Sequence, residues 1–170
     1  KPLARLYGLP AKFEPHLSHV FKKVEFSDSR RGGLLGMGAA LTVTANGIET
    51  SPVTRGVWFL ENLLGTPPPP PPDEVPPIDP DSRGANSIRE QLAKHRELPT
   101  CAGCHEKIDP PGFALENYDP IGRWRSQYPA SRGKRIPIDS SGKLSDGSEF
   151  NGIQQFKLHL LKREDLFVRN

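Results

Sequence analysis

The sequence predicts a mainly helical fold with little β-structure. Three segments combine an apolar helical face with recognisable helix ends, at residues 51–65, 87–96 and 151–164. Strand signals are limited to short runs that glycine and proline interrupt. An apolar content of 35% and a mean hydropathy of −0.55 indicate a small core for a chain of 170 residues, which a large bound group could complete.

The N-terminal part of the chain predicts short elements only. Residues 2–9 have a helical pattern that Pro10 ends, and residues 22–26 have the composition of a strand. Further on, Leu41 and Val43 alternate with threonines after a glycine-rich stretch. This alternation predicts another short strand.

Two longer segments carry the residues that typically begin and end helices. The first starts with the N-cap candidate Ser51, continues with Pro52 and ends at Gly65. The second starts with a capping box formed by Ser87 and Glu90. Both are therefore predicted helices.

Between these helices, residues 67–72 are consecutive prolines, and more prolines follow up to residue 80. Such a run favours polyproline II, which rises about 3.1 Å per residue. We expect a stiff polyproline strap across the domain surface, with loops making up much of the rest.

The C-terminal part predicts a short hairpin followed by a helix. Residues 136–150 have turn-forming pairs at 141–142 and 146–147. Residues 151–164 follow a helical pattern with these apolar residues together: Ile153, Phe156, Leu160 and Leu161.

Charge and hydropathy exclude two classes of protein. There are 23 Lys and Arg residues against 20 Asp and Glu, and the two signs are interspersed. We therefore expect no nucleic-acid surface. No run of 18 apolar residues occurs, so we expect no transmembrane segment.

The only two cysteines form a C-x-x-C-H motif, made by Cys101, Cys104 and His105. This is the pattern of covalent haem c attachment. One helical turn separates the two thiols suitably for addition to the two vinyl groups of a porphyrin. The histidine directly behind them can then reach the iron from one face.

Other interpretations of the motif remain open, namely a zinc site, a redox disulfide and an ordinary thiol pair. Structural zinc takes four ligands, and the chain has no further cysteine to supply them. A thioredoxin-type pair typically follows a strand, whereas here a predicted helix precedes the motif. Haem attachment is the favoured hypothesis.

The segment after the motif is rich in aromatic and apolar residues and is interrupted by prolines at positions 110, 111 and 120. Each apolar residue could line a haem or simply belong to the core. The candidates for lining are Phe113, Leu115, Tyr118, Ile121 and Trp124. The candidates for pairing with haem propionates are Lys107, Arg123 and Arg125.

With His105 as the proximal ligand, the second axial ligand of the iron needs a candidate. His95 is favoured, because it lies six residues before Cys101 on the apolar face of its predicted helix. Met37, the only methionine, is the alternative and would raise the reduction potential. An open site is the third possibility.

Several blocks of the sequence together resemble the planctomycete-type cytochrome c domains, which were first catalogued as domains of unknown function. The resemblance runs from about Arg31 to Arg125, over the blocks RGGLLGMGAALTVTANG, TSPVTRGVWFLENLLGTPPPPPP, LAKHRELPTCAGCH and DPPGFALENYDPIGRWR. It implies a module with one haem c in a large, exported, multidomain protein.

By this resemblance, residues 1–27 end a preceding helical domain, residues 28–128 form the cytochrome c domain, and residues 129–170 begin a small, truncated C-terminal domain. We expect single-electron transfer to or from a partner domain or protein, in the periplasm or at the cell surface. The alternatives are a five-coordinate haem with peroxidase-like or gas-binding activity, and a metal-stabilised interaction module.

Overall fold

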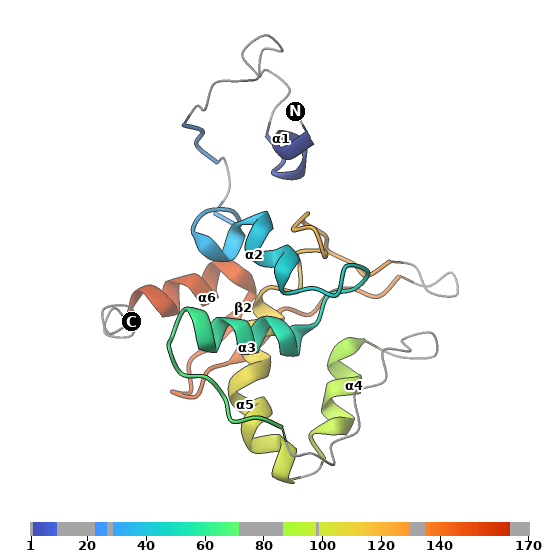
Figure 1. Cartoon of the computed structure of the whole chain (residues 1–170), viewed down its shortest axis with the longest axis vertical. Coiled ribbons are helices and arrows are strands. Elements are labelled where there is room, and N and C mark those ends of the chain that lie inside the picture. Colours follow the sequence, from blue (N-terminus) through green and yellow to red (C-terminus); the bar gives the residue numbers. More distant parts are fainter. Residues whose placement is uncertain are drawn as a thin grey trace.

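A computed structural model describes residues 2–9, 23–26, 29–71, 87–97, 99–129 and 135–163. The described part is mainly helical, as predicted, and its only sheet is an antiparallel pair of short strands (Figure 1). The elements are α1 (Pro2–Leu6), the 3₁₀ turn η2 (Leu34–Gly36), α2 (Gly38–Val43), α3 (Pro52–Asn62), α4 (Ile88–His95), α5 (Pro99–Ala114), β1 (Ser141–Lys143), β2 (Glu149–Asn151) and α6 (Gly152–Leu161).

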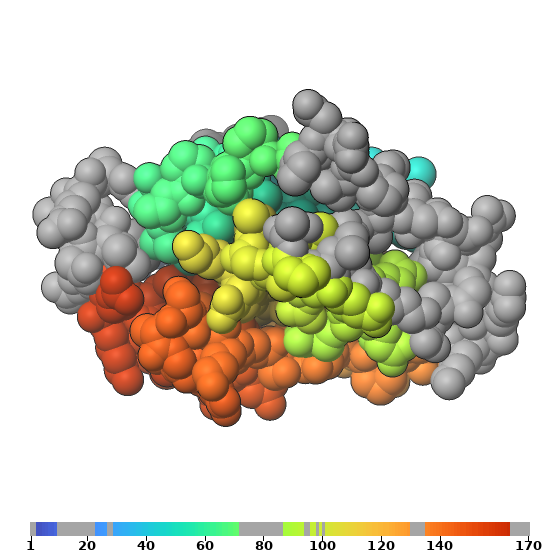
Figure 2. Space-filling model, turned by 90° about the horizontal axis from the view of Figure 1, so that it is seen from below, coloured from blue at the N-terminus to red at the C-terminus, as the bar shows by residue number. Residues whose placement is uncertain are grey.

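Helix α5 is the element around which the others are arranged. It packs against α3 on one side and against β1 and α6 on the other. Figure 2 shows α5 between α3 and the C-terminal hairpin and helix. The C-x-x-C-H motif lies at the N-terminal end of α5 and the hydrophobic core lies towards its C-terminal end.

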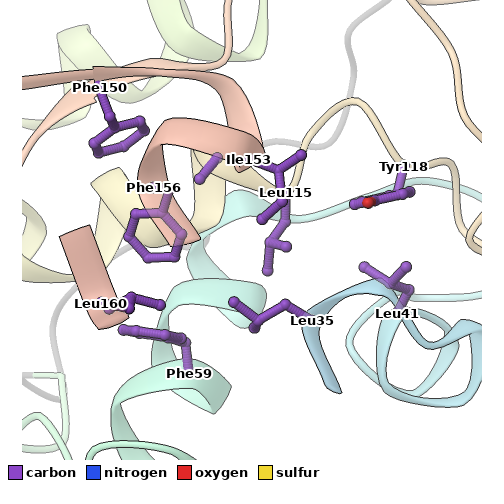
Figure 3. Close-up of a cluster of buried hydrophobic side chains, with 10 residues drawn as sticks. Leu35, Leu41, Phe59, Leu115, Tyr118, Phe150, Ile153, Phe156 and Leu160 are labelled. Carbon is purple, nitrogen blue, oxygen red and sulfur yellow. The ribbon is translucent and has the colours of Figure 1, made fainter. Parts of the chain in front are cut away.

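The hydrophobic core joins the centre of the chain to its C-terminal segment. Phe156 of α6 packs against Phe59 of α3 and Phe150 of β2, with ring centroids 5.3 and 5.1 Å apart (Figure 3). The other members come from the same elements and from η2, α2 and the turn after α5: Leu35, Leu41, Ala114, Leu115, Tyr118, Ile153 and Leu160. The division at residue 129 stays a prediction, but residues on both sides of it share this core.

A lysine of α6 also fastens the C-terminal helix to the start of the central region. Lys157 Nζ donates to the carbonyl oxygens of Ser29, Arg30 and Arg31, at 2.7, 3.2 and 3.2 Å. The two segments lie more than a hundred residues apart in sequence, so this contact ties distant parts of the chain together.

Helices α3 and α5 approach each other so closely that glycine is required on both. A Cβ atom on Gly56 would overlap the carbonyl group of Ile108, and one on Gly112 would overlap the carbonyl group of Pro52. Both positions lie closer than the 3.0 Å that real Cβ atoms keep. The backbones of the two helices are therefore in direct contact at two points.

Beside this crossing, Arg55 of α3 binds the turn that follows α5. Its guanidinium donates to the carbonyl oxygens of Leu115 and Tyr118, both at 2.8 Å, and of Asp119 at 3.1 Å. The side chain is fully buried. Burial lowers the pKa of Arg55 to about 10, so it stays charged at neutral pH.

The charge of Arg55 is balanced by Glu116, whose carboxylate lies 3.8 Å away and is also buried. Glu116 accepts hydrogen bonds from Thr50 and, at 2.9 Å, from Arg125. Burial raises the pKa of the Glu116 carboxyl, while Arg55, Thr50 and Arg125 lower it. This network holds the chain that leaves α5 in one position.

The longer predicted helices are confirmed. In α3, Ser51 is the N-cap and accepts a hydrogen bond from the Thr54 amide at 3.1 Å. Gly65 follows the helix with a positive φ of 59°. In α6, Ile153, Phe156 and Leu160 are buried as predicted, but Leu161 is exposed.

Two expectations about local structure are wrong. The strand predicted around Leu41 and Val43 is helix α2, because Leu41 is buried while Val43, two residues later, is exposed, as on opposite sides of a helix. The prolines at 110 and 111 do not interrupt α5. The carbonyls that lose their helical partners belong to Glu106 and Lys107, which are exposed residues, so water can bind them.

The remaining predicted elements agree with the structure in part. The hairpin forms, and it turns at Gly147 with a φ of 86°, whereas residues 141–142 lie inside β1. Residues 23–26 contain no strand. Residues 67–71 have neither helix nor strand and are mostly exposed, and the rest of the predicted strap lies outside the described residues.

The helix crossing gives a direct test of the fold. We expect Gly112→Ala to lower the free energy of unfolding by about 3 kcal/mol, because the new methyl group displaces the α3 backbone. Urea unfolding followed by far-UV circular dichroism measures this change. Gly103→Ala, on the same helix with open space around it, should instead raise the free energy of unfolding, by at most about 1 kcal/mol. Equal effects of the two substitutions would contradict the crossing.

The buried Arg55–Glu116 pair gives a second test. Arg55→Met leaves Glu116 and three carbonyl groups without their charged partner, so we expect a loss of about 3–5 kcal/mol. In urea unfolding, the Arg55→Met/Glu116→Gln double variant should be more stable than the sum of the single variants predicts. As a control, Arg123→Met removes an exposed pair with Asp119 and should change stability by about 0.5 kcal/mol or less. Additive effects at positions 55 and 116 would argue against the coupling.

Candidate functional site

The three motif residues lie in the first two turns of α5. Cys101 is the third residue of the helix and is buried, and Cys104 follows one turn later and is half-buried. The two cysteines are not joined in a disulfide. His105 is also buried, with 9% of its surface exposed. The helix thus presents two thiols and one imidazole within five residues.

The imidazole of His105 is held by a carboxylate one turn further along the same helix. Its Nδ1 atom lies 2.8 Å from Oδ1 of Asp109. The Asp109 side chain is fully buried, and burial raises the pKa of its carboxyl, while the contact with His105 lowers it. Because Nδ1 is engaged by Asp109, a metal bound to this ring would be coordinated through Nε2.

The second oxygen of Asp109 faces the end of α4. Arg96 Nε lies 3.6 Å from Oδ2 of Asp109. Arg96 directly follows His95, the last residue of α4, and three residues separate His95 from the start of α5. The backbone of His95 therefore lies near the N-terminal part of α5, whereas its side chain lies outside the described residues.

A cavity of about 270 Å³ lies beside the stretch of α5 from Glu106 to Phe113, and the three motif residues are not among its lining residues. Phe113 forms an apolar part of its lining, and the Arg89 guanidinium lies over the Phe113 ring, 3.8 Å from the centroid. Arg89 also pairs with Asp139 at 3.0 Å, and burial lowers the pKa of Arg89. The other lining residues are Arg96, Glu106, Asp109, Pro110, Gly142, Lys143, Leu144, Ser145 and Gly147.

The other predicted lining residues lie beyond the C-terminal end of α5. Tyr118 is buried, donates to the Arg30 carbonyl at 2.5 Å and packs edge-to-face on Trp124 at 5.3 Å. Trp124 lines a second cavity, of about 360 Å³, together with Arg30. Leu115 belongs to the core, and Ile121 is 45% exposed. Of the five candidates, the structure places only Phe113 beside the cavity that Asp109 and Arg96 line.

Met37 lies in the half of the molecule that contains the second cavity. It precedes α2 and is 48% exposed. The next residue, Gly38, donates from its amide to Tyr7 Oη at 2.9 Å. Helix α2 and the first turn of α5 lie at opposite ends of the folded body (Figure 1). The structure therefore does not bring Met37 next to His105.

The predicted propionate partners are also dispersed. Arg125 belongs to the Glu116 network, and Arg123 pairs with Asp119 at 3.3 Å. Lys107 is exposed on α5. The basic side chains that line the cavity beside Asp109 are instead Arg89, Arg96 and Lys143.

The arrangement of donor groups bears on the alternatives to haem. Among the described side chains, no three His, Cys, Asp or Glu residues are placed so that they could hold one metal ion. Cys101, Cys104 and His105 thus do not converge on a single point, as zinc ligands must.

The described helices include none long and apolar enough to span a bilayer.

Sequence reasoning missed Asp109 and Arg96. The spacing of four residues between His105 and Asp109 is the spacing of neighbours on a helix face. This signal was available, but it depended on a helix that continues to Pro110. Arg96 could be placed only once α4 and α5 were seen side by side.

Comparison with known proteins identifies the family. A sequence model of the family described as "PSCyt3: Protein of unknown function (DUF1588)" matches residues 31–128, which is more than half of the chain and includes α3, α4 and α5. Neither a curated protein nor a solved structure gives a significant match. The chain belongs to the PSCyt3 (DUF1588) family.

Proposed function

We propose that the chain is a c-type cytochrome domain that carries one haem c and transfers single electrons. The observation that carries this proposal is a C-x-x-C-H motif on one helix, with the imidazole held through Nδ1 by Asp109. The family name, which points to a cytochrome-like domain, agrees with it. Haem c, when bound, supplies a one-electron redox couple.

The chemistry of the donor set fits this cofactor. Cys101 and Cys104, which lie one helical turn apart and form no disulfide, would hold the porphyrin through two thioether bonds. His105 would bind the iron through Nε2. Asp109 would keep the imidazole in place, and Arg96, which follows α4, would hold Asp109 through its second carboxylate oxygen.

His95 remains our candidate for the second axial ligand. Its backbone ends α4, and the Arg96–Asp109 ion pair fastens that end of α4 beside His105. Met37 has the weaker support, since α2 lies far from the first turn of α5. We further propose a location outside the cytoplasm, where covalent haem attachment takes place, and a redox partner domain or protein.

Haem attachment can be tested by expressing the chain in a host that matures c-type cytochromes. We expect a Soret band that stays with the denatured polypeptide, because the thioether bonds survive unfolding. Cys101→Ser and Cys104→Ser should each retain one thioether bond, which shifts the pyridine haemochrome spectrum, and the double variant should hold no covalent haem. Zinc or a Cys101–Cys104 disulfide in a colourless product would contradict the proposal.

The second axial ligand can be tested with two alanine variants of the haem-loaded protein. We expect His95→Ala to convert the spectrum from low-spin to high-spin, because the iron loses a strong-field ligand. Met37→Ala, the matched control, should leave the spectrum unchanged. If the unaltered protein is already high-spin and binds carbon monoxide, the domain is a five-coordinate haem protein rather than an electron carrier.

A further inference from the structure

We propose that Asp109 is a positioning residue for His105 and that it lowers the reduction potential of the site. This inference rests on the proposed haem c function and concerns a residue outside the motif. Asp109 would act through the imidazole, by fixing its orientation and by strengthening its electron donation to iron.

The geometry of the contact supports a positioning role. The Nδ1–Oδ1 distance of 2.8 Å is that of a charge-assisted hydrogen bond. Both residues lie on α5, one turn apart, so the helix backbone sets their separation. Both are buried, and few water molecules can compete for either partner.

The surroundings of the second carboxylate oxygen of Asp109 indicate which protonation state of the Asp109–His105 pair the geometry favours. Oδ2 of Asp109 lies 3.6 Å from Nε of Arg96, an ion-pair distance, so the positive guanidinium stabilises a charged carboxylate. A charged carboxylate has only acceptors, and His105 must then carry its proton on Nδ1. That tautomer leaves the lone pair on Nε2, the atom that would bind iron.

The effect on the reduction potential follows from this charge. A carboxylate that accepts from Nδ1–H makes the imidazole a more basic ligand. It also places negative charge near the iron in a buried setting, which stabilises the more positive, oxidised metal. Both effects act in the same direction, towards a lower potential.

Asp109→Asn tests this inference, since it keeps the shape of the side chain and removes its charge. We expect a higher midpoint potential in redox titration of the haem-loaded protein. Glu61→Gln, the control, also removes one negative charge, at an exposed position on α3, and should leave the potential close to that of the unaltered protein. The midpoint potential of Asp109→Glu should lie between those of Asp109→Asn and the unaltered protein. It also serves as the test if Asp109→Asn does not fold.

A second readout separates this inference from the proposed function. In the full chain without haem, nitrogen-15 NMR should show the Nδ1–H tautomer of neutral His105, and Asp109→Asn should shift the ring towards the other tautomer. If the unaltered protein, Asp109→Asn and Asp109→Glu all take up haem and have the same midpoint potential, the role of Asp109 is overturned and the cytochrome proposal stands. Absence of covalent haem would overturn the cytochrome proposal, and the tautomer would then decide whether Asp109 positions His105.

Discussion

The direct contact between the backbones of α3 and α5 is the constraint on which the rest of the structure depends. Gly56 and Gly112 allow the approach, and no other residue type fits at either position without moving a helix. Because Arg55 precedes Gly56, the same crossing brings its guanidinium under the end of α5. Core packing, the buried charge and the position of the motif helix all follow from this one approach.

Two buried carboxylates, one on α5 and one just after it, have different partners. Glu116, at the C-terminal end, is surrounded by Arg55, Arg125 and Thr50, so its charge is balanced within a structural network. Asp109, nearer the motif, has one arginine and one imidazole as partners. Of these two carboxylates, only Asp109 contacts a side chain that can bind a metal, which agrees with the proposed haem site on that part of the helix.

Sequence reasoning succeeded where the determinants are local. Ser51, Pro52 and Gly65 define the ends of α3 through their own backbone and capping preferences, and the motif is defined by residue types and spacing. Sequence reasoning failed where contacts between residues far apart in the sequence determine the local structure. The alternation at Leu41 predicts a strand, yet Leu41 is buried while Val43 is exposed, which is the pattern of a helix. Asp109 was missed because Pro110 and Pro111 concealed the length of α5, which continues through both prolines.

The anchoring of α6 by Lys157 bears on where this module can be cut. The family match ends at residue 128, but Phe150, Phe156 and Lys157 lie beyond it. A fragment trimmed to residues 31–128 would expose Phe59 and leave the carbonyl group of Arg31 without its lysine. The unit that similarity delimits is therefore smaller than the unit that shares one hydrophobic core.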